Sequence, residues 1–192
     1  MIGLCFTCLA LSRHVKHRPI IGVHGGAGRV RKISDKEKRE IENALIDSLR
    51  VGLGALRGGT ALDAVEEAVK YMEASGLFNA GKGAVVNVRG EIELDAGIMW
   101  GKNLSVGAVA SLKYTWNAIS LARLVMEKTD HLLITGEGAD LLARKFGFEL
   151  HPGPTKRILE RFNEYKAMLD EKKFDLWKNN YEVSDVFTGD TV

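Results

Sequence analysis

The sequence predicts an α/β fold, of the α+β type, in which helices cover an antiparallel sheet. Amphipathic helical patterns occur in neighbouring pairs and strand patterns occur in groups, instead of alternating one by one as in βαβ units. No Pro-, Gly- or Ser-rich linker divides the 192 residues. A chain of this length without a linker is expected to form one compact domain with irregular ends.

The charge balance argues against a dedicated nucleic-acid-binding protein. The chain has 27 basic and 25 acidic side chains, a net charge of +2, and no basic stripe. No apolar stretch reaches the roughly 20 residues that a membrane span requires. Gln is absent, which favours a thermophilic source because amide side chains are thermolabile. We therefore expect neither nucleic acid nor a membrane as a partner.

Residues 1–18 are predicted to be an extension outside the domain. Their apolar run precedes the basic residues, which is the reverse of the order in a secretory signal. Cys5 and Cys8 form a Cys-x2-Cys motif, but His14 follows too closely for a zinc finger. Free thiols in a reducing cytoplasm are the simpler interpretation, so a cytoplasmic location is expected.

Residues 20–24 are apolar and lead into His24-Gly25-Gly26-Ala27-Gly28, which predicts a buried strand entering a tight turn. Glycines there can bring backbone N–H groups close to a ligand, as in oxyanion holes. The motif lacks the ending of a P-loop and the third glycine of a dinucleotide fingerprint. Taken alone, it is more typical of a tight turn than of a site.

Two tandem helices are predicted next. Ser34 and Glu37 form the pattern of a capping box, and an apolar stripe continues from there to Leu56. Thr60 with Asp63 predicts the start of the second helix. The apolar face of that helix is expected at Leu62, Val65, Val69 and Met72.

Strand patterns follow the two helices. Residues 86–88 and 91–95 alternate around Arg89-Gly90, which predicts a hairpin, and residues 104–112 predict a third strand. The carboxylates on this face are Glu91, Glu93 and Asp95, and a solvated strand face explains them better than a metal site. Further elements are a helix at 117–128, a strand at 132–135 and a helix at 137–146.

The chain is therefore divided into four parts. The extension at 1–18 is followed by a core at 19–150, a highly charged helix at 151–178, and a polar linker at 179–192.

Asn79, between a helix end and the hairpin, can aim its amide at a reaction centre, although Asn with glycines is also ordinary turn chemistry.

Seven segments in co-linear order over residues 20–147 resemble the plant-type L-asparaginase/isoaspartyl peptidase family of N-terminal-nucleophile hydrolases. The segments are IGVHGGAG (21–28), GGTALDAV (58–65), FNAGKGA (78–84), ELDA (93–96), GAVA (107–110), ARLVMEKT (122–129) and GEGA (136–139). One five-residue motif would mean little, whereas seven in order are highly specific.

The resemblance implies an αββα sandwich that is incomplete without a β-subunit. It also implies autocleavage between Asp190 and Thr191, after which Thr191 is the N-terminal nucleophile. The freed amine, with a reference pKa of about 8, would act as the base. The implied reaction hydrolyses L-asparagine to L-aspartate and ammonia, with isoaspartyl peptides as related substrates.

The resemblance further assigns roles inside the chain. Gly25, Gly26 and Asn79 would line the pocket and support the oxyanion. A structural sodium ion would be held by backbone carbonyls, and no cofactor is required. The carbonyls implied are those of Met72, Glu73, Ser75, Phe78, Ala80 and Lys82.

Two departures from the family pattern leave alternatives open. Asp190 stands where asparaginase-type members carry Gly, as in the related glycosylasparaginases. The chain ends at Val192, so its expected partner is a β-subunit beginning at the nucleophile, in an (αβ)2 homodimer. Alone, it is expected to be inactive and self-associating. A non-catalytic binding domain of the same fold, and a serine hydrolase using the His-Gly-Gly turn, are the competing hypotheses.

Overall fold

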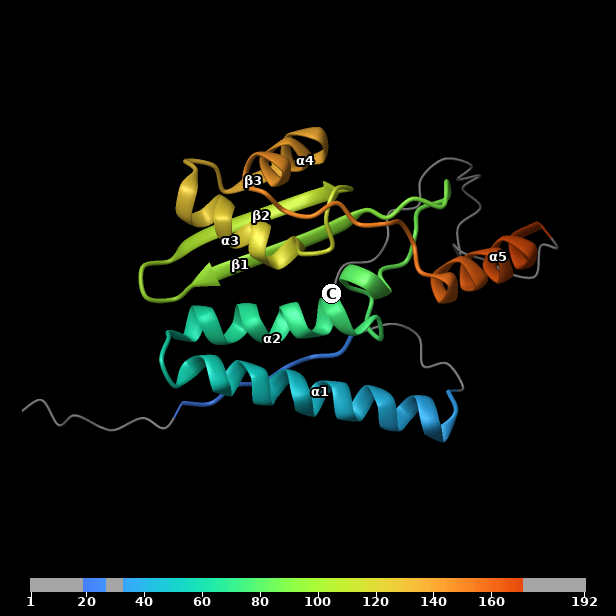
Figure 1. Cartoon of the computed structure of the whole chain (residues 1–192), viewed down its shortest axis with the longest axis horizontal. Coiled ribbons are helices and arrows are strands. Elements are labelled where there is room, and N and C mark those ends of the chain that lie inside the picture. The colour runs from blue at the N-terminus through green and yellow to red at the C-terminus, as the bar shows by residue number, and fades with distance from the viewer. Residues whose placement is uncertain (1–18, 27–32, 171–192) are drawn as a thin grey trace, which may run out of the picture.

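A computed structural model describes residues 19–26 and 33–170 (Figure 1). The elements in chain order are α1 (Asp35–Leu56), α2 (Ala61–Ser75), the 3-10 helix η1 (Gly81–Gly83), β1 (Leu94–Trp100), β2 (Ser105–Leu112), α3 (Ala118–Lys128), β3 (Leu133–Thr135), α4 (Gly136–Lys145) and α5 (Lys156–Asp170). The predicted α/β class is confirmed. None of the helices in the described ranges is long and apolar enough to cross a membrane.

The strands of the described residues form one sheet in the order β1-β2-β3. β1 and β2 are antiparallel, with Ile98 opposite Gly107. β2 and β3 are parallel, with Val109 opposite Ile134. The expectation of a purely antiparallel sheet is therefore wrong for β3. Between these strands α3 crosses over the sheet, which returns the chain to the end from which β2 started.

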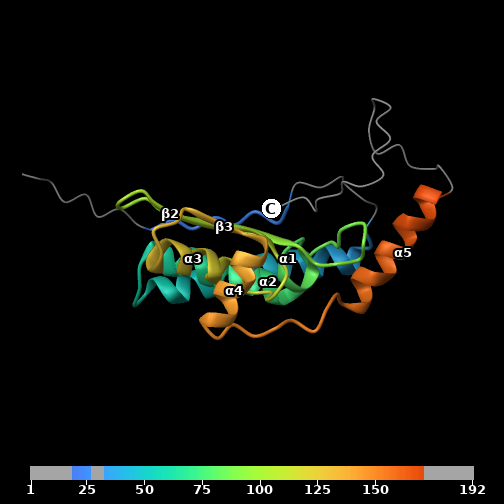
Figure 2. The ribbon, with the colours of Figure 1, turned by 90° about the horizontal axis from the view of Figure 1, so that it is seen from above.

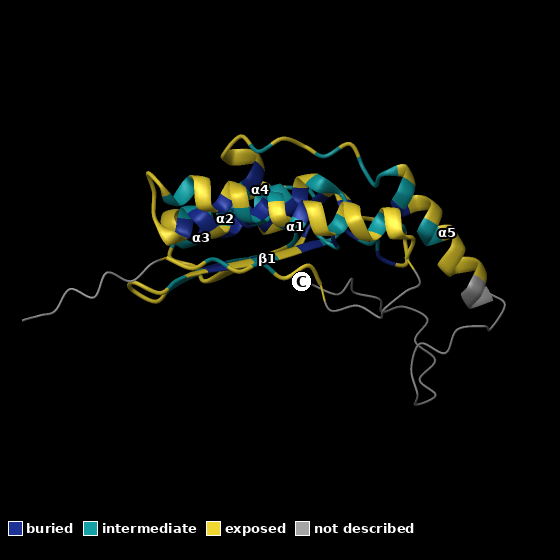
Figure 3. Ribbon diagram, turned by 90° about the horizontal axis from the view of Figure 1, so that it is seen from below, coloured by how far each residue is buried: buried dark blue, intermediate teal, exposed yellow. Residues whose placement is uncertain are grey.

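The helices α1 to α4 lie on one side of the strand layer (Figures 2 and 3). The core between them includes the fully buried side chains of Val109, Leu112, Leu121 and Val125. β1 alternates between the two sides, since Ile98 is buried and Met99 is 56% exposed. One helix layer on one sheet is consistent with part of an αββα sandwich.

Small residues bring α1 and α2 close together, which the predicted leucine stripe of α1 did not indicate. The buried positions of α1 are Ala44, Ser48 and Gly52, whereas Leu53 is 44% exposed. A Cβ atom on Gly52 would lie 2.8 Å from the carbonyl oxygen of Ala64 in α2. Val65, predicted on the apolar face of α2, is 41% exposed.

The starts of the first two helices are confirmed, and the full capping box is shown at the second. The Ser34 hydroxyl oxygen accepts a hydrogen bond from the N–H of Glu37, at 3.2 Å. Thr60 and Asp63 form a complete capping box at the start of α2.

The predicted hairpin is shorter than expected. Gly90 has a φ of 79° in the turn, but before β1 begins at Leu94 the two arms share only the bridge between Val86 and Ile92. The Asn87 N–H donates to the Glu91 carbonyl at 2.9 Å, as in a ladder, but the Asn87 side chain accepts from the N–H groups of Arg89 and Glu91 and so takes the Glu91 N–H out of the ladder.

The predicted strand at 20–24 is absent from the structure. Residues 19–26 contain no strand, and Ile20 is 95% exposed. In Figure 2 this segment lies in the same layer as the strands, yet no strand of the described chain pairs with it. An extended apolar segment becomes a strand only when a neighbour satisfies its backbone groups.

α5 lies at one end of the molecule, inside the range predicted for the charged helix (Figure 1). The Arg157 Nη2 atom lies 2.9 Å from Glu37 Oε1 and connects α5 to the start of α1. Residues 1–18, 171–178 and 179–192 of the predicted division lie outside the described residues.

Candidate functional site

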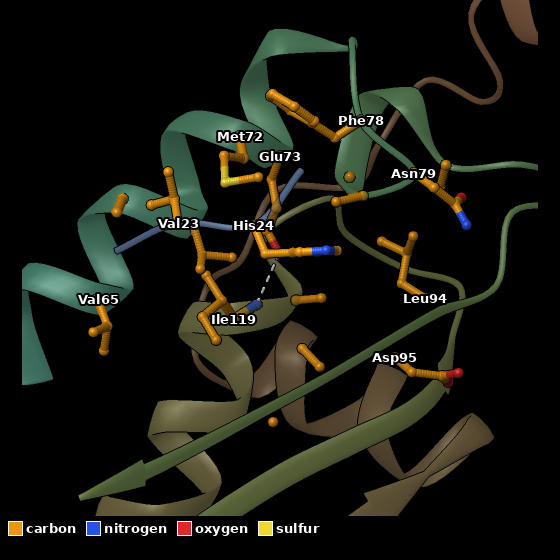
Figure 4. A pocket seen from close by; sticks show the side chains of 18 of the residues that line it. Val23, His24, Val65, Met72, Glu73, Phe78, Asn79, Leu94, Asp95 and Ile119 are labelled. Atoms are coloured by element: carbon orange, nitrogen blue, oxygen red, sulfur yellow. Dashed lines mark hydrogen bonds between the residues drawn. The ribbon is translucent and has the colours of Figure 1, made fainter. Parts of the chain in front are cut away.

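A cavity of about 340 Å³ opens where several of the motif segments meet (Figure 4). Its walls come from residues 21–24, the inner face of α2, the loop after α2, the first half of β1 and the first residues of α3. Most of the wall is apolar, and the polar side chains in it are those of His24, Glu73, Asn79, Glu93 and Asp95.

The geometry of the His-Gly-Gly turn disfavours a side chain at either glycine. A Cβ atom on Gly25 would lie 3.1 Å from the Phe78 ring and 3.2 Å from the Leu45 side chain. Gly26 has a φ of 119°, a conformation that side chains disfavour. The Gly26 N–H donates to Nδ1 of His24, at 3.2 Å. Ala27 and Gly28 lie outside the described residues.

Asn79 lies in the loop that joins α2 to the turn before β1. Its Oδ1 atom accepts a hydrogen bond from the backbone N–H of Val85, at 2.9 Å, which orients the side-chain amide. Gly81 has a φ of 50°, and a Cβ atom there would lie 2.6 Å from the carbonyl oxygen of Glu73. The loop therefore folds back tightly on the last turn of α2.

Glu73 places a carboxyl group inside the protein. The residue is 3% exposed, and its Oε1 atom accepts a hydrogen bond from the N–H of Ile119, at 3.0 Å (Figure 4). Its Oε2 atom is buried and has no hydrogen-bond partner among the described residues. Burial raises the pKa of Glu73 to about 8, against the opposing effect of the N–H groups of Ile119 and Ala118.

The loop after α2 is rich in backbone oxygens that are suited to a hard cation. Glycines at 81 and 83 let the backbone approach the carbonyl groups of Glu73 and Phe78. The carbonyl of Met72 accepts from the Ser75 hydroxyl at 2.7 Å, and that of Ala80 accepts from the Gly83 N–H at 3.0 Å. Backbone carbonyl oxygens are hard ligands, of the kind that hard cations take in proteins.

The acidic residues of the hairpin bind protein groups. Lys113 Nζ lies 2.9 Å from carboxylate oxygens of both Glu91 and Glu93. Hydrogen bonds from Lys113 and Asn87 lower the pKa of Glu91 to about 2. Asp95 Oδ1 accepts from the N–H of Ser111 at 2.8 Å. Within the described residues, no cluster of three or more His, Cys, Asp or Glu side chains is placed to hold a metal ion.

The structure brings most of the candidate residues to one place. Met72, Glu73, Phe78, Asn79 and Ala80 line the cavity, and Gly25 and Gly26 follow its wall residue His24. Ser75, the last residue of α2, and Lys82, in η1, do not line the cavity, and Lys82 Nζ lies 5.5 Å from the Trp116 ring centroid. Asp190 and Thr191 lie outside the described residues.

The sequence analysis missed the side-chain role of Glu73. The signal was present, because residue 73 follows Val69 by four positions and so extends the apolar face of α2. A carboxylate on such a face is rarely buried unless something binds it. The partner, an N–H group 46 residues further along the chain, left no local pattern.

Comparison with known proteins identifies relatives of the chain. A family model described as asparaginase matches residues 17–189. A plant-type L-asparaginase of Pyrococcus horikoshii is 44% identical over 81% of this chain and 50% of its own length. The plant-type L-asparaginase of Thermococcus kodakarensis is 46% identical over 78% of this chain and 48% of its own length. The isoaspartyl peptidase/L-asparaginase of Homo sapiens is 44% identical over 84% of this chain and 53% of its own length. The chain spans about half the length of these curated relatives.

Proposed function

Because the chain belongs to the asparaginase family, we propose that it supplies the N-terminal half of an L-asparaginase that also hydrolyses isoaspartyl peptides. The observation that carries the proposal is the shared cavity of the His-Gly-Gly turn and the Asn79 loop. His24 and Asn79 are 55 positions apart in the sequence, and both line this cavity. A cavity of this kind, with mostly apolar walls and a few polar side chains, suits a small substrate.

The proposed nucleophile is Thr191, released by cleavage after Asp190. The Thr191 hydroxyl attacks the Asp190 carbonyl, the peptide bond shifts to an ester, and water hydrolyses the ester to free the threonine amine. That amine then takes the hydroxyl proton when Thr191 attacks the side-chain amide of asparagine. Ammonia leaves with the proton, and water hydrolyses the acyl-threonine to release aspartate.

The described residues would contribute to this reaction by stabilising the negative charge that develops on the substrate's carbonyl oxygen. Asn79 is oriented through its Oδ1 atom by the N–H of Val85, so its amide has a defined direction before substrate binds. Gly25 lies against the ring of Phe78, the neighbour of Asn79, at a distance where a Cβ atom would be 3.1 Å from that ring, and Gly26 has a φ of 119°. Groups fixed in advance stabilise a developing negative charge without reorganising.

We propose a β-subunit that begins at the nucleophile as the partner, in an (αβ)2 assembly. Two exposed features support a partner here. The outer face of the sheet carries Met99 and Leu133, which are 56% and 53% exposed. β1 is an edge strand of the described sheet, and the cavity separates it from residues 21–24, whose backbone pairs with no described strand. Added strands would pair with the free edge of β1 and with the backbone of residues 21–24.

The sodium ion belongs to the same proposal. It would be held by backbone carbonyls of the loop from Met72 to Lys82, where it would hold the loop's shape and take no part in bond breaking. Asp190 ahead of the nucleophile favours a second candidate, a glycosylasparaginase-like enzyme, in which the same groups would act on a glycosylated asparagine.

A hybrid precursor tests the proposal. It joins residues 1–190 of this chain to the second half of the Thermococcus kodakarensis relative, beginning at threonine, with Thr191→Ala as the matched control. We expect mass spectrometry to show cleavage before Thr191 and an enzyme assay to show ammonia release from L-asparagine, with neither in the control. Glycosylated asparagine, offered in parallel, identifies the second candidate. A folded, monodisperse precursor that never cleaves would show that the chain is a non-catalytic domain.

A further inference from the structure

The start of α3 is capped from a distant part of the chain. The first N–H groups of a helix have no partner within the helix, and a side chain at the N-cap position usually accepts from them. Asn117 occupies that position and its side chain makes no capping hydrogen bond. The carboxyl group of Glu73, from the last turn of α2, takes its place by accepting from the N–H of Ile119.

Glu73 also supports the loop that carries Asn79. The backbone of Gly81 is packed against Glu73 so closely that a Cβ atom on Gly81 would lie 2.6 Å from both the Cβ atom and the carbonyl oxygen of Glu73. Gly81 begins η1 two residues after Asn79, and the Asn79 side chain accepts from Val85 just beyond η1. One residue therefore touches the start of α3 through its side chain and the site loop through its backbone.

We infer that Glu73 is a positioning residue, whose carboxyl group fixes the Asn79 loop relative to α3 and the sheet. Stability alone does not account for a carboxyl group at this position. A buried acid costs desolvation free energy, and its Oε2 atom recovers none of that cost from a hydrogen bond in the described chain. An apolar side chain of similar volume in this apolar-walled cavity would avoid that cost. What only the carboxyl group provides is a directional contact between the two elements.

Hydrogen exchange, followed by NMR on the full 192-residue chain, tests the inference without reference to activity. The variants are Glu73→Leu, which removes the acceptor, and Glu73→Gln, which keeps one. We expect Glu73→Leu to accelerate exchange at Ala118, Ile119 and Val85 by about tenfold, relative to the core amides of Val109 and Val125. Glu73→Gln should stay within about threefold of the wild type at the same amides.

Glu66→Gln is the matched control. Glu66 is also on α2 and also binds α3, through Arg123 and Ser120, and its side-chain hydrogen bonds in the described chain go to α3 alone. It should leave Val85 exchange unchanged after the same normalisation. If Glu73→Leu loses protection only at Ala118 and Ile119, or loses it uniformly across the core, Glu73 is only a cap and the inference is wrong. If Glu73→Leu does not fold, the exchange rates of the same amides are measured in Glu73→Asp. Its shorter side chain withdraws the acceptor oxygen from the Ile119 N–H.

A second readout rests on the proposed function. In the hybrid precursor, Glu73→Leu should lower kcat about tenfold to a hundredfold with KM within about threefold, and Glu73→Gln should recover most of kcat. Unchanged kcat in Glu73→Leu would contradict the inference. An inactive wild-type hybrid would contradict the proposed function alone, and the exchange experiment would still decide the role of Glu73.

Discussion

The Nη1 atom of Arg123 lies 2.7 Å from Oδ1 of Asp63, so an ion pair joins the middle of α3 to the first turn of α2. The same Arg123 atom lies 2.7 Å from Glu66 Oε2, and Arg123 Nε lies 2.8 Å from Glu127 Oε1. The Asp63 carboxylate thus closes the capping box of α2 and connects the two helices that enclose the candidate site. We therefore expect the contact between these two helices to weaken in acid.

Asp63 is expected to contribute stability that disappears in acid. Hydrogen bonds from the backbone and side chain of Thr60, and then from Arg123, lower the pKa of Asp63 from 3.8 to about 2. Because its pKa is lower in the folded state, its contribution is present above pH 3.8 and is lost as the pH falls toward 2. Urea midpoints of the wild type and Asp63→Asn should therefore differ most at pH 5 and least near pH 2. Asp35→Asn, at the start of α1, is the control, and a difference that does not vary with pH would contradict the assignment.

A methyl group at Gly52 is expected to destabilise the contact between α1 and α2. The Cβ atom of Gly52→Ala would lie 2.6 Å from Ile21 Cδ1 and 2.8 Å from the carbonyl oxygen of Ala64, so the helices must move apart. We expect a loss of about 1–3 kcal/mol in the free energy of unfolding. Gly54→Ala, two residues along the same helix and with open space around it, should gain up to about 1 kcal/mol. Equal effects of the two changes in urea unfolding would refute this account.

Two substitutions at Asn79 separate its structural role from its proposed chemical role. Asn79→Ala removes the acceptor for the Val85 N–H and should lower stability by about 1 kcal/mol. Asn79→Asp keeps an oxygen for Val85 but loses the amide donor. In the hybrid precursor its turnover should fall by about 10²–10³, the usual effect of losing one oxyanion donor. Turnover of Asn79→Asp at the wild-type level would exclude Asn79 from oxyanion support.

Sodium is expected to stabilise the loop after α2. At constant ionic strength, replacing choline chloride by sodium chloride should raise the melting temperature of the chain, because a cation that binds only the folded loop adds its binding free energy. The exchange of loop amides such as Val85 should slow in parallel. Identical melting curves in the two salts would remove sodium from the proposal and leave the loop supported by its hydrogen bonds alone.

The sequence was sufficient for features that depend on neighbours along the chain. The caps at Ser34 and Thr60 follow from partners three residues away, and helix and strand periods indicated most of the elements. The ordered motifs identified the family, and the resemblance that they carry predicted one site for the turn at 24–28 and the Asn79 loop. Such features are visible in a sequence because their contacts are local or recur in a fixed order.

Only the tertiary structure decided features that depend on neighbours in space. The direction of β3, the missing strand at 20–24 and the close approach of α1 to α2 at Gly52 each depend on which backbone lies alongside. The hydrogen bond from Ile119 to Glu73 joins residues 46 positions apart. A hydrogen bond or a packing contact is set by distances of a few ångströms, and the fold brings those atoms together without leaving a periodic trace in the sequence.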